Sequence, residues 1–217
     1  MAQKIKIDCH THSILSPDGA ITHEQYATVL KKGILDMVAI TDHHSVEYAQ
    51  FVQKKLGEKI IVGEEMSTLE GHVIGLFLHK TIPSHLSLED TIEEIKRQGG
   101  LVYIPHALDS LRHGIGLENV MKSANNIDIF EVFNARVILK NQNTQAKNVA
   151  ESMGFLKGLG SDAHNSQALG YSYVTISSFP TKQTFKKTLS DGIFHTQYLP
   201  FSAFFYPKIN TIRKYLS

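Results

Sequence analysis

Short apolar segments alternate with amphipathic segments along the chain, the pattern expected of strands followed by helices. Ile5 and Ile7 alternate with Lys4, Lys6 and Asp8, which predicts a first short strand. Residues 37–41 form a nearly continuous apolar run, as in a strand buried on both faces. Further strands are predicted over residues 60–63, 73–78, 101–104, 127–133, 156–159 and 173–176.

Capping residues mark the starts of the predicted helices. Thr22 and Gln25 form a capping-box pattern ahead of an apolar stripe that includes Tyr26 and Val29. Gly33 suits the end of this helix, because glycine readily adopts the left-handed conformation found there. Further helices are predicted over residues 46–56, 143–153 and 184–189, and between Ser87 and Gly99.

The strand-then-helix unit recurs about seven times, which predicts an α/β fold with parallel strands covered by helices. Polar residues recur just past the strands, as at the C-terminal rim of a closed barrel. At 217 residues the chain is near the lower limit for eight units, so a trimmed or irregular TIM-like barrel is predicted. An open doubly wound sheet is the alternative. We expect a single domain over residues 1–217, with residues 179–217 packed on the barrel.

Histidines and carboxylates gather at the ends of the predicted strands. His10 and His12 stand one residue apart, so in a strand both imidazoles face the same side and could grip one metal ion. If the strands over 60–63 and 73–78 form a hairpin, Glu65 and His72 share a rim as well. The full set of candidates is His10, His12, Asp18, His43, Glu65, His72, His106, Asp162 and His164.

Each candidate also has a purely structural interpretation. His43 could cap a helix, Asp162 could be an N-cap, and His106 could be a buried, hydrogen-bonded histidine. Nine such groups converging without partners would cost several kcal/mol, a cost that bound cations would remove. Because the donors are nitrogen and oxygen, zinc, manganese, iron or cobalt fits better than a soft metal.

Composition narrows the classes of partner. The net charge of +1 gives no strong attraction to long nucleic acids or to an anionic membrane. The single cysteine, Cys9, excludes an internal disulfide and fits a reducing cytoplasm. No signal-peptide pattern and no apolar run of about 18 residues is present. We therefore expect a cytoplasmic protein that acts on small molecules.

Five motifs in order resemble those of the PHP (polymerase and histidinol phosphatase) metallophosphoesterases, over about residues 5–178. They are His10-Thr11-His12, Ile40-Thr41-Asp42-His43, Gly63-Glu64-Glu65-Met66-Ser67, Pro105-His106 and Gly160-Ser161-Asp162-Ala163-His164. The resemblance implies a distorted seven-stranded barrel, (β/α)7, with two to three divalent ions such as zinc, manganese or iron. About 25 residues separate Leu78 from His106, which indicates the small stand-alone form with a more open pocket.

The resemblance also implies three sets of metal ligands. It assigns His10, His12, Glu65 and Asp162 to the first ion, Glu65, His72 and His106 to the second, and Asp18, His43 and His164 to the third. Glu65 is preferred to Glu64 as the bridge between the first two ions, because it directly precedes Met66-Ser67. Some family members have histidine where this chain has Asp18.

This centre is suited to hydrolysing small phosphomonoesters, with nucleotides among the candidates and a metal-bridging hydroxide as nucleophile. Arg112 and Arg136 are candidates to clamp phosphate oxygens, together with Asn134. Each arginine could equally be a solvent-exposed surface residue that makes no contact with substrate. The catalytic candidates beside Glu65 are His44 and His113, either of which could protonate the leaving oxygen, and Asp42, which could orient His43 or another ligand.

Three other functions remain open. The first is an exonuclease or oligonucleotide phosphodiesterase, which the weak net charge disfavours for long substrates. The second is a non-catalytic, metal-stabilised regulatory module, which the complete ligand set disfavours. The third is an amidohydrolase, for which no lysine is placed as a bridging ligand.

Overall fold

A mixed β-sheet forms the centre of the molecule. The computed structural model describes residues 4–216, so residues 1–3 and 217 of the predicted domain lie outside the description. Within the described residues the sheet has nine strands in the order β7-β6-β5-β4-β3-β2-β1-β8-β9. They are β1 (Ile5–Thr11), β2 (Met37–Ile40), β3 (Ile60–Ser67), β4 (His72–Leu76), β5 (Leu101–Ile104), β6 (Ile129–Asn134), β7 (Lys157–Gly160), β8 (Tyr173–Ile176) and β9 (Ile193–His195).

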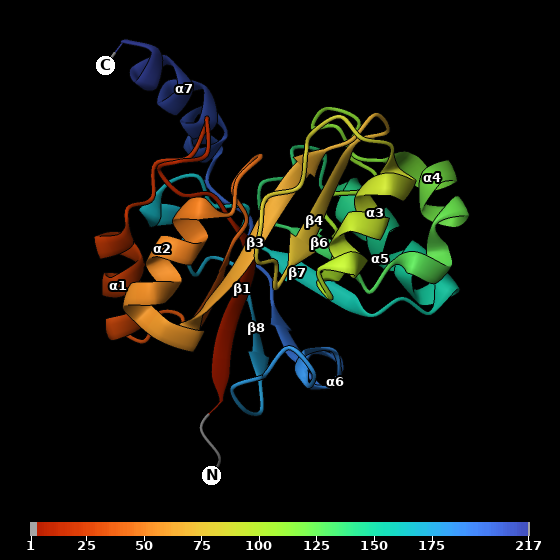
Figure 1. Cartoon of the computed structure of the whole chain (residues 1–217), viewed down its shortest axis with the longest axis horizontal. Coiled ribbons are helices and arrows are strands. Elements are labelled where there is room, and N and C mark those ends of the chain that lie inside the picture. The colour runs from red at the N-terminus through yellow and green to blue at the C-terminus, as the bar shows by residue number, and fades with distance from the viewer. Residues whose placement is uncertain (1–3, 217) are drawn as a thin grey trace.

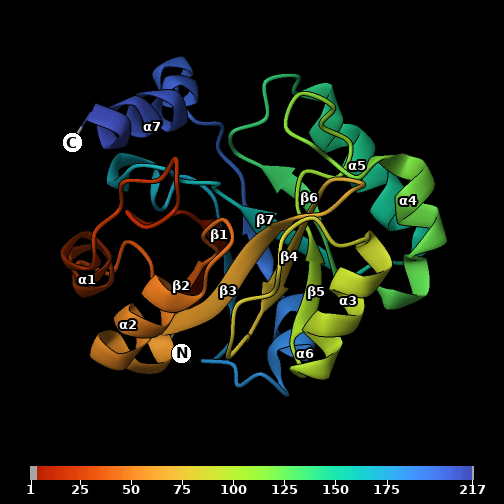
Figure 2. The ribbon, with the colours of Figure 1, turned by 45° about the horizontal axis from the view of Figure 1, so that its top comes forward.

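The sheet curls into a nearly closed barrel (Figures 1 and 2). The main-chain N–H of His12 donates to the carbonyl of Ala163 over 2.8 Å, so the chain just past β1 lies beside the chain just past β7. The distorted barrel is therefore confirmed, and the open doubly wound alternative is wrong. The expectation of parallel strands holds for only part of the sheet, because β4 runs antiparallel to both neighbours and β8 runs antiparallel to β1. The predicted hairpin is β3–β4.

Helices cover the outside of the barrel. Helices α1 and α2 lie on one flank and α3, α4 and α5 on the other, whereas α7 stands apart from both groups (Figure 2). The helices are α1 (His23–Lys31), α2 (Glu47–Leu56), α3 (Leu88–Arg97), α4 (Gly116–Lys122), α5 (Asn141–Met153), α6 (Phe185–Ser190) and α7 (Tyr206–Leu216). The capping box of α1 is confirmed, with the N–H of Gln25 donating to the Thr22 hydroxyl. Within residues 4–216 no helix is both long and apolar enough to span a membrane.

Among the α-helices and strands of residues 4–216, α4, β9 and α7 were not predicted. The apolar residues of all three are largely exposed, and α4 and β9 span only 7 and 3 residues, which is too few for a clear periodic pattern. In α4 the buried residue is Val120, and in β9 Ile193 is 51% exposed. In the aromatic segment before α7, Phe201 is 73% exposed whereas Ala203 is buried.

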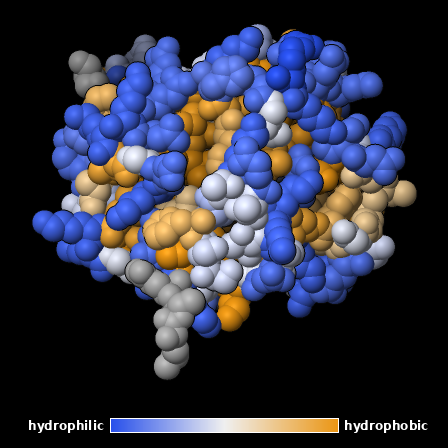
Figure 3. Space-filling model, turned by 60° about the horizontal axis from the view of Figure 1, so that its bottom comes forward, coloured by the Kyte–Doolittle hydropathy of each residue, from blue (hydrophilic) through white to orange (hydrophobic). Residues whose placement is uncertain are grey.

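Apolar side chains fill the barrel as well as the space under the helices. Ile7, Tyr103 and Leu159 belong to an interior cluster that draws on β1 through β8, and Phe185 of α6 joins it. Burying each such side chain contributes about 1.5–3 kcal/mol. Figure 3 shows the end of the barrel where β1 begins, with hydrophilic side chains around the face and hydrophobic ones between them. The interior core supports the opposite end, where the polar candidates lie.

Candidate metal centre

A bulge in β1 directs His10 and His12 into the centre. Ile5, Ile7 and Cys9 point into the interior cluster, so strict alternation would turn His10 and His12 to the other face. The pairing of β1 with β2 shifts register between Asp8 and Thr11, and this irregularity re-aims the strand. Both histidines are fully buried, with Nε2 atoms 3.1 Å apart.

Glu65 lies between two pairs of histidines. Its Oε2 is 3.2 Å from Nε2 of both His10 and His12. Its Oε1 is 3.0 Å from Nδ1 of His72 and 3.1 Å from Nε2 of His106. One carboxylate thus faces two groups of imidazole nitrogens, which is the arrangement of a bridging ligand.

The two glutamates lie within β3, and the expected end of the strand at Gly63 is wrong. Because β3 continues to Ser67, Glu64 and Glu65 are successive strand residues and face opposite sides. Glu64 accepts a hydrogen bond from the N–H of Ile82 over 3.0 Å, outside the centre. The geometry therefore singles out Glu65.

A further group of ligands forms around Asp18. Its Oδ2 is 2.9 Å from Nε2 of His164 and 3.8 Å from Nε2 of His43. His12 stacks on both imidazoles, with ring centroids 4.2 Å from His164 and 4.8 Å from His43. Asp18, His43 and His164 come together as predicted, and His12 joins them.

All nine predicted ligands take part in such groups. Within residues 4–216, four sets offer ligand atoms that lie within 4.8 Å of one another. The sets are His12, Asp18, His43 and His164; His10, His106 and Asp162; His10, His12 and Glu65; and Glu65, His72 and His106.

The donor atoms fit a divalent cation. Nδ1 of His72 is buried and has no hydrogen-bond partner in the described part of the chain, although it lies 3.0 Å from Oε1 of Glu65. An imidazole nitrogen that lies beside a carboxylate without hydrogen-bonding to it suits a shared metal ion. Imidazole nitrogens with carboxylate oxygens form the ligand set typical of zinc, manganese and iron.

Charge outweighs burial at the central carboxylates. Burial alone would raise the pKa of Glu65, but His10 and His43 hold that pKa well below its usual range. Burial would likewise raise the pKa of Asp162, and Arg136 and His10 lower it well below its usual range. Both groups are therefore ionised at neutral pH and available to cations.

Two histidines of the same centre have pKa values shifted in opposite directions. Burial lowers the pKa of His43 to about 3, so its imidazole is neutral and has a lone pair available. Burial also disfavours charge on His12, but hydrogen bonds to Asp162 and Glu65 raise its pKa to about 9. A metal ion that binds His12 must therefore displace a proton.

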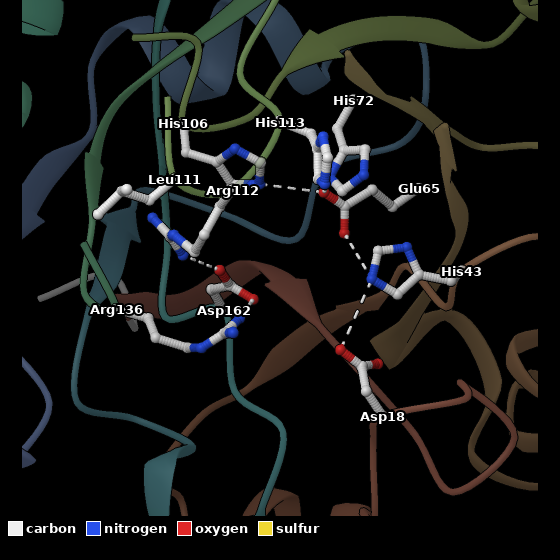
Figure 4. A pocket seen from close by; sticks show the side chains of 10 residues that line it. All are labelled: Asp18, His43, Glu65, His72, His106, Leu111, Arg112, His113, Arg136 and Asp162. Atoms are coloured by element: carbon white, nitrogen blue, oxygen red, sulfur yellow. Dashed lines mark hydrogen bonds and ion pairs between the residues drawn. The ribbon is translucent and has the colours of Figure 1, made fainter. Parts of the chain in front are cut away.

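Two arginines converge on Asp162 at one side of the open cavity (Figure 4). Arg112 donates from Nη1 to Asp162 Oδ2 over 2.5 Å and from Nε to Asp109 over 2.7 Å. Arg136 donates from Nη1 to Asp162 Oδ1 over 3.2 Å. Arg112 Nη2 and Arg136 Nε are buried and have no hydrogen-bond partner within residues 4–216. Both guanidinium groups line a cavity of about 180 Å³ together with metal-ligand candidates.

Asn134 lies behind this cavity and does not line it. It is 1% exposed, and its amide donates to Glu131 and Asp162 while accepting from Arg112. Its hydrogen-bonding capacity is thus used within the protein. We therefore assign it to positioning Asp162 and Arg112, in place of the predicted phosphate contact.

The other catalytic candidates occupy different surroundings. Asp42 is buried and accepts hydrogen bonds from the N–H and the hydroxyl of Ser13, so it anchors the chain after His12 and makes no hydrogen bond to His43. Nδ1 of His44 lies 2.6 Å from the hydroxyl oxygen of Ser84. His44 is not among the residues that line the cavity, whereas His113 is.

Sequence reasoning missed Glu131 on β6. The N–H at Nδ1 of His10 donates to Glu131 Oε1 over 3.2 Å, and Tyr103 donates to the same oxygen over 2.9 Å. The main-chain N–H of His106 donates to Oε2 over 2.7 Å. Glu131 therefore leaves Nε2 of His10 free for a metal. The available signal was a carboxylate inside the apolar run 127–133.

Sequence reasoning also missed Asn210 on α7. Its amide donates to the main-chain oxygens of Asp18, over 2.9 Å, and of His164, over 3.0 Å. Lys214, one turn further on, donates to the carbonyl of Ile14 over 2.6 Å. The helix, which projects from the barrel in Figure 1, is thereby tied to the loops that carry two ligand candidates.

Known proteins resemble this chain in sequence and in fold. The PHP domain family matches residues 8–199. The uncharacterized protein MJ0417 of Methanocaldococcus jannaschii is 34% identical over 182 residues, which cover 80% of this chain and 71% of the relative. A two-domain Bacteroides vulgatus protein containing a predicted PHP-like metal-dependent phosphoesterase superposes with a TM-score of 0.67 at 18% identity, covering 89% of this chain and 66% of that one. The lesion-specific endonuclease PfuEndoQ of Pyrococcus furiosus gives 0.61 at 14% identity, covering 88% and 58%.

Proposed function

Because the chain belongs to the PHP domain family, we propose that it is a metal-dependent phosphoesterase that hydrolyses small phosphomonoesters. The observation that carries this proposal is the cavity shared by ligand candidates and two arginines. Both guanidinium groups line this cavity, and within residues 4–216 the donors Arg112 Nη2 and Arg136 Nε have no hydrogen-bond partner. Donors of this kind suit the outer oxygens of a phosphate group. The cavity of about 180 Å³ is small, which favours a terminal phosphate.

The nine ligand candidates would hold two to three divalent ions. In the assignment that the family resemblance implies, His10, His12, Glu65 and Asp162 would hold one, and Asp162 Oδ1 lies 3.7 Å and 3.5 Å from Nε2 of His10 and His12. Glu65 with His72 and His106 would hold a second, and Asp18, His43 and His164 a third. Bound divalent ions would lower the pKa of a water molecule and neutralise phosphate oxygens that gain charge.

The protein itself would orient the ester and supply a proton. Arg112 and Arg136 would hold the phosphate against the ligand groups, with the ester oxygen turned away from them. In hydrolysis a water oxygen forms a bond to phosphorus while the bond between phosphorus and the ester oxygen breaks, and the ester oxygen leaves with the electron pair and takes up a proton. His113 lines the cavity with its ring 5.5 Å from that of His72, and we assign it as the proton donor.

The decisive experiment compares classes of substrate. Protein loaded with manganese, zinc or iron is assayed with p-nitrophenyl phosphate, nucleoside monophosphates and sugar phosphates, and in parallel with dinucleotides. We expect kcat/KM to be higher for the monoesters than for the dinucleotides. A preference for dinucleotides would support the nuclease alternative, and absence of turnover on every substrate in the metal-loaded protein would contradict both.

A further inference from the structure

A second cavity, of about 540 Å³, lies beside the first one and shares His72 and His113 with it. We propose that it binds the leaving group of the substrate, and that this group is neutral and rich in hydroxyls, as in a sugar, a polyol or a nucleoside. The inference rests on the proposed function, since it takes the phosphate to bind in the first cavity. The size suits a small organic molecule, for which sites of roughly 300–1,000 Å³ are usual.

Two histidines that are not ligand candidates are held in strained conformations at this cavity. His85 and His113 have φ of 61° and 55°, in the left-handed region that non-glycine residues seldom adopt. The main-chain N–H of His85 donates to the carbonyl of Ser67 over 2.7 Å, and the main-chain carbonyl of His113 accepts from the N–H of His72 over 2.8 Å. Such strain persists where the surroundings impose it, and it concentrates at functional sites. The hairpin that carries the ligand candidates therefore also holds these two residues.

The chemistry of the wall indicates what it would bind. In the part of the chain that the structure describes, the side chains of Ser67, Ser110, His85 and His113 make no hydrogen bond to another protein group, and all four line the cavity. A hydroxyl group both donates and accepts hydrogen bonds, and an imidazole ring offers two further nitrogen atoms for them, as sugar hydroxyls require. Four such groups in one wall suit a ligand that carries several hydroxyls.

Charge at the two cavities differs. Among the described residues that line the second cavity none is lysine or arginine, and Glu70 contributes a carboxylate. A second phosphate or a carboxylate on the leaving group would meet that charge without a cation to balance it. Arg112 and Arg136 lie on the other side of the first cavity, across from His72 and His113 (Figure 4). The phosphate would thus face the arginines, and the leaving group would extend past His113.

Two variants test the assignment. His85→Gly removes the imidazole while keeping a residue suited to positive φ, and Ser110→Ala removes a hydroxyl. Each is assayed on a hexose phosphate and on p-nitrophenyl phosphate, whose leaving group offers no such set of hydroxyls. We expect the ratio of kcat/KM for the hexose phosphate to that for p-nitrophenyl phosphate to fall by roughly fivefold to tenfold, the size expected for one hydrogen bond. His79→Ala, an exposed histidine outside both cavities, should leave the ratio unchanged.

The wild-type protein supplies the second arm. A hexose monophosphate should exceed both a hexose bisphosphate and a phosphoglycerate in kcat/KM. Equal or better use of the anionic substrates, or an unchanged ratio in both variants, would overturn the leaving-group assignment while phosphatase activity itself stands. If no phosphomonoester is hydrolysed by any metal-loaded form, the proposed function fails first, which is a separate outcome.

Discussion

Glu64 and Glu65 are adjacent in β3, yet their carboxylates serve different sides of the sheet. Glu65 lies within 3.2 Å of four imidazole nitrogens, whereas Glu64 accepts one main-chain hydrogen bond from Ile82. The two residues have the same chemistry and nearly the same burial, at 1% and 0% exposure. They therefore form a matched pair in which only the direction of the side chain differs.

Glu65→Gln should remove metal ions, and Glu64→Gln should not. An amide at position 65 carries no charge and binds cations weakly, so both groups that share this carboxylate lose affinity. We expect the Glu65 variant to retain fewer ions per chain and to lose nearly all turnover, and elemental analysis after metal-replete purification measures the first effect. Comparable metal loss in the Glu64 variant would show that bridging is assigned to the wrong residue.

Glu64 should make stability depend on pH. Burial raises its pKa to about 7, from 4.5 for an unperturbed side chain, so the folded state favours the protonated acid. The contribution of Glu64 to the free energy of unfolding is therefore fully present below the pKa of the unfolded state, and it is lost as the pH rises through about 7. A glutamine does not ionise, so the Glu64→Gln variant does not lose stability in this way. The free energy of unfolding of the variant should therefore exceed that of the wild-type protein by a margin that grows between pH 5 and pH 8, to at most about 3 kcal/mol. Urea unfolding of both proteins across this range measures it; a constant difference would contradict the assignment.

Arg112→Ala or Arg136→Ala should lower kcat/KM for a phosphomonoester by roughly 10- to 1000-fold, because a charged contact to a phosphate oxygen is lost. Metal content should be retained, since Asn134 still donates to Asp162 over 3.3 Å. Arg97→Ala is the control, because this exposed arginine of α3 pairs with Glu94 on the same helix. Near-full activity in both cavity variants would mean that the phosphate is held without them.

Asn210→Ala should weaken the ligand group of Asp18 and His164. The amide joins the main-chain oxygens of these two residues, so its loss frees the loops to separate. Second-layer contacts of this kind change metal affinity by roughly 10- to 100-fold. Titration with zinc should show one class of site weakened and the others retained. Ile209→Ala, at the neighbouring position with 40% exposure, should leave all sites unchanged, and identical titrations for both variants would contradict the role of Asn210.

Features set by local spacing could be predicted from the sequence. The interval between His10 and His12, the capping box of Thr22 and Gln25, and the return before His72 each depend on residues close together in the chain. Strand periodicity and turn chemistry are short-range properties, so they can be recognised without the fold. Most ligand candidates could be collected for the same reason, since they lie at an end of an apolar strand run, whereas Asp18 lies in the loop after the first strand.

Tertiary structure decided which distant groups meet. Glu131 lies 121 residues from His10, and Asn210 lies 192 residues from Asp18, yet each pair is in hydrogen-bond contact. The bulge in β1 that turns His10 inward is likewise visible only in the pairing with β2. These contacts depend on the register at which the sheet curls and nearly closes, and on where the C-terminal helix packs. The periodicity of apolar residues along the sequence gives no information about the register of the sheet or the position of this helix. Both are determined by the whole set of buried side chains together.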